Sequence, residues 1–136
     1  MGNMFPAITT AQSGMGLYKA WIDATSDNVA NVNTVRRTNQ PAYQARRIVG
    51  QTANAPDGVT GAGARVAAVV FGDPNGRNVY EPDNPLADDQ GMVRYPDINL
   101  SDEMTSLIIA QRAYQANVTA FERARDGYLR ELEIGK

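Results

Sequence analysis

The densest set of side chains that could do chemistry lies between Tyr80 and Gly91. The carboxylates of Asp83, Asp88 and Asp89 are hard oxygen ligands of the kind that Ca²⁺ prefers. Their spacing does not match the twelve-residue calcium loop, which needs Gly at position 6 and Glu at position 12. The prolines in the stretch favour a rigid turn instead, and no candidate nucleophile lies nearby in sequence for acid–base work.

Two arginine pairs, Arg36-Arg37 and Arg46-Arg47, surround Tyr43. They could contact nucleic acid or an anionic cell-wall polymer. In a chain of net charge −2, ion pairs between subunits or a solvated face are the favoured interpretation, so no nucleic-acid partner is expected. The glycines at 58, 61 and 63 match no phosphate-binding fingerprint and predict a flexible loop.

The absence of Cys and His from all 136 residues narrows the possible chemistry. It removes disulfides, thiolate nucleophiles, the commonest general base and the commonest transition-metal ligand. We therefore expect no enzyme activity, no catalytic residue, no metal and no cofactor. The sequence has no run of 18 apolar residues, so no transmembrane segment is expected. The first ten residues lack the features of a cleavable signal peptide.

Two long helices are expected to position whatever the chain presents. Pro6 suits a first helical turn, and the helical pattern from there continues to about Ala30, where a cluster of asparagines should end it. Ser101 could cap a second helix that continues to about Glu133. Gly14 and Gly16 either weaken the first helix or let another backbone approach closely.

The middle of the chain, residues 35–99, has a different character and holds six of the seven prolines. Short β-type runs are predicted at Tyr43–Val49, Arg65–Phe71, Val79–Tyr80 and Met92–Tyr95, with an irregular stretch from Gln51 to Gly63. The turn signals between them are Pro56-Asp57-Gly58, Pro74-Asn75-Gly76 and Asp89-Gln90-Gly91. The sequence thus divides into 1–34, 35–99 and 100–136.

Apolar residues repeat every seven positions in both terminal segments, as in the seam of a coiled coil. Such stripes start at Ile8 and Ala11 in the first segment and at Met104 and Leu107 in the last, where Gln111 and Arg125 interrupt them. The stripes predict long terminal helices, so we expect a mainly α fold. Because the stripes are similar in length, the N- and C-terminal helices should pair as an antiparallel coiled coil around a short β-rich insert. The termini could pair with each other or with copies of the same chain, which indicates assembly.

Three separated motifs resemble the bacterial flagellar axial proteins of the rod and hook. They are Asn28-Val29-Ala30-Asn31-Val32-Asn33-Thr34, the stretch from Tyr80 to Val93, and Ala110-Gln111-Arg112-Ala113-Tyr114-Gln115-Ala116-Asn117. With the short length, they are most similar to the proximal-rod FlgC family. The family's Pro-Tyr-Arg-Arg stretch differs here, as Pro41-Ala42-Tyr43-Gln44-Ala45-Arg46-Arg47.

This resemblance implies a structural subunit of the basal-body rod, exported through the flagellar type III apparatus without signal cleavage. The subunit would polymerise through its terminal helices and transmit motor torque within the cell envelope. Its partners would be other rod proteins, copies of itself, and ring and export components. The alternatives are another short axial component or a small module that binds a cell-wall polymer.

The resemblance also implies that Asn28, Asn31, Thr34, Tyr114 and Asn117 serve as packing and capping positions. Together with the stripes, the expected interface residues are Ile8, Ala11, Met15, Tyr18, Ile22, Asn28, Val29, Asn31, Thr34, Met104, Leu107, Gln111, Tyr114, Asn117, Val118, Phe121, Tyr128 and Leu132.

Overall fold

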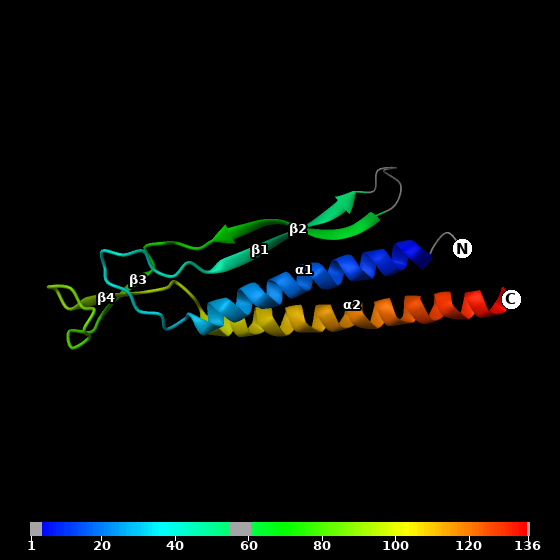
Figure 1. The fold of residues 1–136 in the computed structure, drawn as a ribbon. Helices are drawn as coiled ribbons and strands as arrows, with labels where there is room; N and C mark the ends of the chain where they lie inside the picture. Colours follow the sequence, from blue (N-terminus) through cyan, green and yellow to red (C-terminus); the bar gives the residue numbers. More distant parts are fainter. Residues whose placement is uncertain (1–3, 55–60, 136) are drawn as a thin grey trace.

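The computed structural model describes residues 4–54 and 61–135. Its elements are helix α1 (Met4–Ala30), strands β1 (Arg46–Asn54), β2 (Gly61–Phe71), β3 (Arg77–Tyr80) and β4 (Met92–Tyr95), and helix α2 (Leu100–Ile134). Figure 1 shows three elongated layers, in which the β1–β2 hairpin lies along α1 and α1 lies along α2. Both termini are at one end and β3–β4 at the other. The prediction of a mainly α fold with a small β insert is confirmed.

The helices have nearly the expected bounds, but α2 is capped by a different residue. The side chain of Asn99 accepts a hydrogen bond of 3.2 Å from the backbone N–H of Asp102. Asn is at least as good an N-cap as Ser, so the helix begins at Leu100 and the prediction of Ser101 as the cap is wrong. Asp102 and Glu103 lie in the first turn, where the helix dipole favours negative charge.

The β1–β2 hairpin is longer than the sequence pattern predicted. Residues 51–54 belong to β1 and residues 61–63 to β2, so the prediction of an irregular stretch is wrong for both of these segments. The reason is support from α1, because the hydroxyl of Ser13 accepts a hydrogen bond of 3.0 Å from the backbone N–H of Ala64. The predicted Pro56-Asp57-Gly58 turn lies outside the described residues. The two strands pair antiparallel, with irregularities after Val49 and after Thr52.

The two helices pack side by side in opposite directions. Asn28 contacts Glu103, and Gly14 contacts Asn117, so fourteen residues separate the two positions on each helix. Farther along, the ring of Phe5 meets the edge of the Tyr128 ring at 5.1 Å between centroids. These contacts place the start of α1 beside the end of α2, as the antiparallel expectation required.

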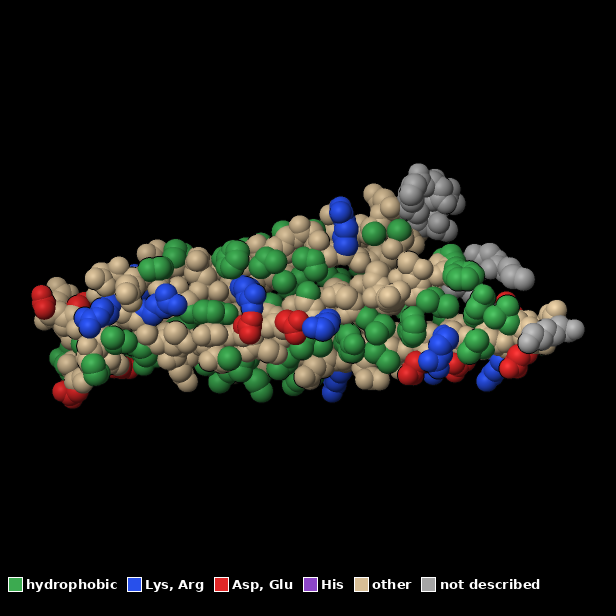
Figure 2. Space-filling view, in the orientation of Figure 1, with side chains coloured by type: hydrophobic (Ala, Val, Ile, Leu, Met, Phe, Trp, Pro, Cys, Tyr) green, Lys and Arg blue, Asp and Glu red, His purple; other side chains and the backbone are tan. Residues whose placement is uncertain are grey.

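The interior is thin and built from small side chains. The buried apolar residues of the two helices are Ala11, Ala24 and Ala110, whereas many large apolar side chains are exposed. Figure 2 shows apolar side chains spread over this face of the molecule, along the helices and the hairpin. None of the described helices is long and apolar enough to cross a membrane.

Of the two glycines in α1, one allows a close approach. A Cβ on Gly14 would lie 2.8 Å from Cγ of Asn117 and closer still to its Oδ1, so the side chain of Asn117 occupies the space that glycine leaves open. A Cβ on Gly16 would meet nothing within 4 Å. Gly14 therefore makes room for the side chain of Asn117 and not for another backbone as predicted, and Gly16 makes room for neither.

The two glycines should respond oppositely to alanine. Gly16→Ala should stabilise the chain by up to about 1 kcal/mol, because alanine favours helix and nothing clashes. Gly14→Ala should destabilise it by roughly 1–3 kcal/mol, because the packed Asn117 side chain must move. Urea unfolding followed by far-UV circular dichroism measures both. In an Asn117→Ala background, Gly14→Ala should become stabilising; continued destabilisation there would contradict the packing argument.

Candidate functional site

Asn28 is the polar centre of the helix pair. It is 1% exposed, and its amide group makes four hydrogen bonds. Nδ2 donates to the carbonyl of Arg46 at 2.9 Å and to Oε2 of Glu103 at 3.1 Å. Oδ1 accepts from the backbone N–H of Arg46 at 2.9 Å and from the hydroxyl of Tyr43 at 3.2 Å. One side chain thus joins α1 to the start of β1 and to the first turn of α2.

The hydroxyl of Tyr43 stays a donor in this cluster. Burial first, and the negative charge of Glu103 second, raise the pKa of Tyr43 above its ordinary value of 10.0. The hydroxyl is therefore protonated at neutral pH and available to Asn28. Neither Tyr43 nor Arg46 was expected to contact Asn28, because nothing in the local sequence signals pairing over 15 to 18 residues.

Asn31 and Thr34 close the C-terminal end of α1. Nδ2 of Asn31 donates to the carbonyl of Asp27 at 2.8 Å, and the hydroxyl of Thr34 donates to Oδ1 of Asn31 at 3.0 Å. The carbonyl of Asp27 also accepts from the backbone N–H of Asn31 at 3.1 Å, so the Asn31 side chain adds a second bond at the last turn and Thr34 holds that side chain in place. The geometry is that of a helix terminus, as the asparagine cluster predicted.

The contact surface of α2 is shifted by one residue from one of the predicted stripes. Met104 and Leu132 are each 45% exposed, and Gln111 and Arg125 are exposed as well. Glu103, Ala110 and Asn117, one position earlier, contact α1 or are fully buried, and Tyr128 of the Leu107 stripe contacts Phe5 of α1. Four of the five residues of the Met104 stripe are therefore exposed in this chain, and Val118 is half-buried. A stripe at Glu103, Ala110, Asn117 and Ala124 has the same spacing of seven and was available in the sequence.

The other expected residues fall into two groups by exposure. Ala11 is buried like Asn28. Half-buried positions are Ile8, Met15, Tyr18, Ile22, Val29, Asn31, Thr34, Leu107, Tyr114, Asn117, Val118, Phe121 and Tyr128.

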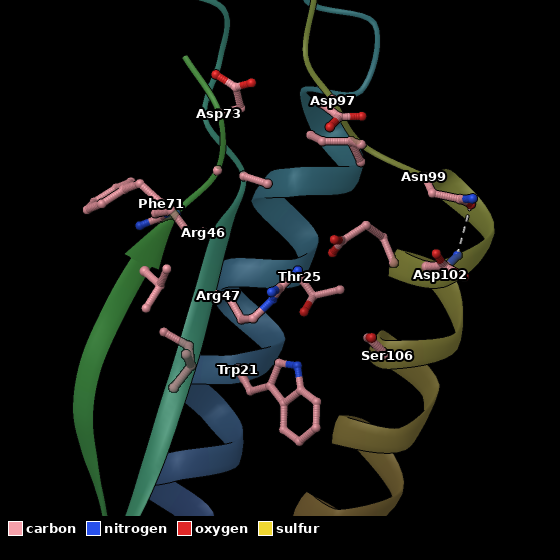
Figure 3. A pocket seen from close by; sticks show the side chains of 16 residues that line it. Trp21, Thr25, Arg46, Arg47, Phe71, Asp73, Asp97, Asn99, Asp102 and Ser106 are labelled. Atoms are coloured by element: carbon pink, nitrogen blue, oxygen red, sulfur yellow. Dashed lines mark hydrogen bonds between the residues drawn. The ribbon is translucent and has the colours of Figure 1, made fainter. Parts of the chain in front are cut away.

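A groove of about 500 Å³ opens between the hairpin and the start of α2. Figure 3 shows Trp21 and Thr25 of α1 between its two walls. Arg46, Arg47 and Phe71 belong to the hairpin wall, and the side of α2 forms the other. At this level the hairpin and α2 therefore do not pack against each other, and the groove lies between them.

The arginine pairs do not act together in this structure. The guanidinium of Arg46 forms an ion pair with Asp27 of α1, and the backbone of Arg36 pairs with that of Arg94 in β4. Arg37 and Arg47 are exposed. An ion pair within the chain thus accounts for Arg46, where the sequence predicted ion pairs between subunits or a solvated face.

The stretch from Tyr80 to Gly91 is a hydrogen-bonded turn. Oδ1 of Asp88 accepts from the backbone N–H groups of Gln90 and Met92, each at 2.9 Å, and Oδ2 accepts from the hydroxyl of Thr38 at 2.8 Å. The hydrogen bond from Met92, followed by that from Thr38, lowers the pKa of Asp88 below its ordinary value of 3.8. Both carboxylate oxygens hold the turn together, as the rigid-turn interpretation predicted. The described residues contain no cluster of acidic side chains that could hold a metal ion.

Comparison with known proteins identifies the family. Residues 89–128 match the family model described as flagellar basal body rod FlgEFG protein C-terminal. The chain is 34% identical over 126 residues to the flagellar basal-body rod protein FlgC of Yersinia enterocolitica, covering 93% of each chain. It is 32% identical to FlgC of Salmonella typhimurium over the same share, and 26% identical to FlgC of Bacillus subtilis over 97% of this chain and 98% of that one.

This chain belongs to the FlgC family. The family-model match begins at Asp89, in the turn that Asp88 holds, and continues through β4 and most of α2. It therefore includes Asn117, which fills the space over Gly14. The likeness to FlgC proteins covers nearly the whole chain, so the middle segment shares it with the helices.

Asn28→Ala should destabilise the chain by about 2–4 kcal/mol, because it leaves the partly buried backbone N–H and C=O of Arg46 without their Asn28 partners. Asn31→Ala removes hydrogen bonds at the more exposed helix end and should cost about 1 kcal/mol or less. Urea unfolding of both purified variants measures the difference. Equal losses would contradict the central role of Asn28.

The turn should weaken in acid. Because the folded pKa of Asp88 lies below 3.8, its contribution to stability is complete above that pH and is lost as the pH falls through the folded pKa. Thr38→Val should raise the pKa of Asp88 by removing one hydrogen bond to the charged form. Carboxyl ¹³C NMR titration measures this pKa, and Thr34→Val, which leaves Asp88 untouched, is the control. An unchanged pKa in Thr38→Val would contradict the assignment.

Proposed function

We propose that this chain is a structural subunit of the flagellar basal-body rod. The observation that carries the proposal is the row of large apolar side chains exposed along α2 in a member of the FlgC family. Exposed apolar rows of this kind mark protein–protein contacts, and an isolated subunit leaves them in water. Neighbouring rod subunits, both copies of this chain and other rod proteins, would cover them.

The proposed subunit has a helical shaft and an inserted lobe. The segments 1–34 and 100–136 form the shaft, in which α1 and α2 pair as an antiparallel coiled coil, and 35–99 forms the insert. The contacts of Gly14 with Asn117 and of Phe5 with Tyr128 support this pairing. A pair of long helices in one register is stiff along its axis, which suits the transmission of torque.

The expected interface residues divide between two roles in this proposal. The buried and half-buried ones, such as Ala11, Leu107 and Phe121, hold the two helices of one subunit together. The exposed ones, Met104, Gln111 and Leu132, contact neighbouring subunits. The residues that the helix contact leaves uncovered are thereby assigned to the assembly.

A structural role is proposed in place of a catalytic one. The relatives reported above are rod proteins by name, and the carboxylate of Asp88 is committed to backbone and hydroxyl donors. A cell-wall-binding module is not favoured, since the hairpin depends on α1 for its support. The proposed location is the basal body, on the periplasmic side of the cell envelope, with contacts to ring and export components.

Deletion of the gene in its host should abolish swimming and leave cells without hooks and filaments, because everything distal to the rod depends on it. A plasmid copy should restore both. Electron microscopy of isolated basal bodies and motility in soft agar are the measurements. Normal filaments in the deletion strain would overturn the proposal.

A pair of neighbouring substitutions tests the exposed row. Leu132→Ser should reduce swimming severalfold, since it removes an apolar side chain from the proposed subunit contact. Glu131→Ser, at the adjacent exposed position, is the matched control and should swim normally. Far-UV circular dichroism should show the same helix content in both. Equal motility of the two variants would contradict the assignment of Leu132.

A further inference from the structure

Strand β2 has the most exposed apolar surface of the middle segment. Val66, Val69, Val70 and Phe71 are between 40% and 59% exposed, and every residue from Arg65 onward in the strand is exposed. One edge of β2 pairs with β1, and no further strand joins this sheet among the described residues. An apolar edge strand of this kind is an aggregation site unless another surface covers it.

The first three turns of α2 carry a second uncovered apolar surface. Leu100, Met104, Ile108 and Ile109 are between 45% and 51% exposed. Among the described helices and strands, α2 packs only against α1, so the hairpin of the same chain does not cover these residues. The groove over Trp21 separates the two surfaces (Figure 3).

The two surfaces carry opposite charge. The described part of the hairpin contains Arg46, Arg47 and Arg65 and no acidic residue. The first turns of α2 contain Asp102 and Glu103, and no basic residue precedes Arg112. Within the described structure Arg47, Arg65 and Asp102 take part in no ion pair; Arg47 and Asp102 line opposite walls of the groove, whereas Arg65 lies outside it.

The two surfaces also lie at one level along the molecule. Asn28 bonds to Arg46 of the hairpin and to Glu103 of α2, which places the start of β1 level with the first turn of α2. The strand partners of residues 46–48 are Phe71, Val70 and Val69, the exposed end of β2. A second copy displaced sideways, without a shift along the helix axis, would therefore bring one surface against the other.

We propose that the β1–β2 hairpin of one copy packs on the first three turns of α2 in the laterally adjacent copy of this chain. The contact joins unlike surfaces, so each copy can donate a hairpin on one side and accept one on the other, and the series continues around a ring or helix. The inference rests on the proposed function in taking the chain to assemble with itself. Pairing of β2 with β2 is disfavoured, because it brings arginines together and leaves α2 uncovered.

Cysteine cross-linking tests the contact directly, since the chain has no cysteine of its own. Two full-length copies with different tags, Val70→Cys and Ile109→Cys, are expressed together, and isolated basal bodies are oxidised with copper phenanthroline. A mixed-tag dimer should form at least about tenfold more than either same-tag dimer, because a contact between unlike surfaces apposes only unlike residues. A single copy with both substitutions should give a ladder of multimers.

The matched control is Val70→Cys with Ile134→Cys. Ile134 is 85% exposed and lies on the same helix as Ile109, about 38 Å away at 1.5 Å per residue, so random collision would favour it. The proposed contact predicts at least about tenfold less cross-linking for this pair than for Val70→Cys with Ile109→Cys.

Three results would overturn the inference: equal yields for the Ile109 and Ile134 pairs, dominant dimers of Val70→Cys with itself, or a cross-link of Val70→Cys only to a different rod protein. If the tagged copies are found in basal bodies but do not cross-link, this inference fails and the proposed function stands. If unsubstituted tagged chain is absent from basal bodies, the proposed function fails. The purified full-length variants are then mixed at high concentration and scored by the same yields.

Discussion

The side-chain amide of Asn28 is the interaction on which the arrangement of the three layers depends. A buried amide is stable only when its donors and acceptor are all satisfied, and here Arg46, Tyr43 and Glu103 satisfy them. Because Arg46 begins the hairpin and Glu103 lies in the first turn of α2, one residue fixes how far each layer slides along α1. The hairpin follows α1 from there, and α2 runs back beside it to the meeting of Phe5 with Tyr128.

A chain whose hairpin, α1 and α2 lie in three thin layers has little interior. Small residues at the contacts, such as Ala11, Gly14 and Ala110, bring the helices close together, but they bury little apolar area. The larger apolar side chains remain on the outer faces of α2 and β2. The same geometry that makes the subunit slender therefore makes it depend on neighbours, and this is the property a rod subunit needs. Membership of the FlgC family and the exposed surfaces lead to the same function by independent routes.

Much of the fold could be predicted because it is local. Heptad spacing predicted two long helices, and the similar lengths of their stripes favoured an antiparallel arrangement. Pro6 and the asparagine cluster bounded the first helix, and the motif around Asn117 pointed to the family. The turn of Asp88 could also be predicted from the sequence, since prolines and short polar residues form such turns with their own neighbours. The ends of the hairpin could not be predicted, because Asn54, Gly61 and Gly63 have weak β propensity. The strands there depend on pairing across the hairpin and on the contact of Ser13 with Gly63 and Ala64.

The sequence by itself determined that two long amphipathic helices exist and that the chain is built for assembly, because periodicity is a property of each segment alone. Only the tertiary structure decided how far α2 is rotated about its axis, and therefore which residues beside the Leu107 stripe face α1. Stripes at Met104 and at Glu103 differ by one residue, which turns the helix surface by about 100°. Apolarity favoured the Met104 stripe, but α1 must contact both the hairpin and α2, and the bonds of Asn28 to Arg46 and Glu103 set the rotation. Since Glu103 is 75 residues from Asn28, no local pattern could have revealed that choice.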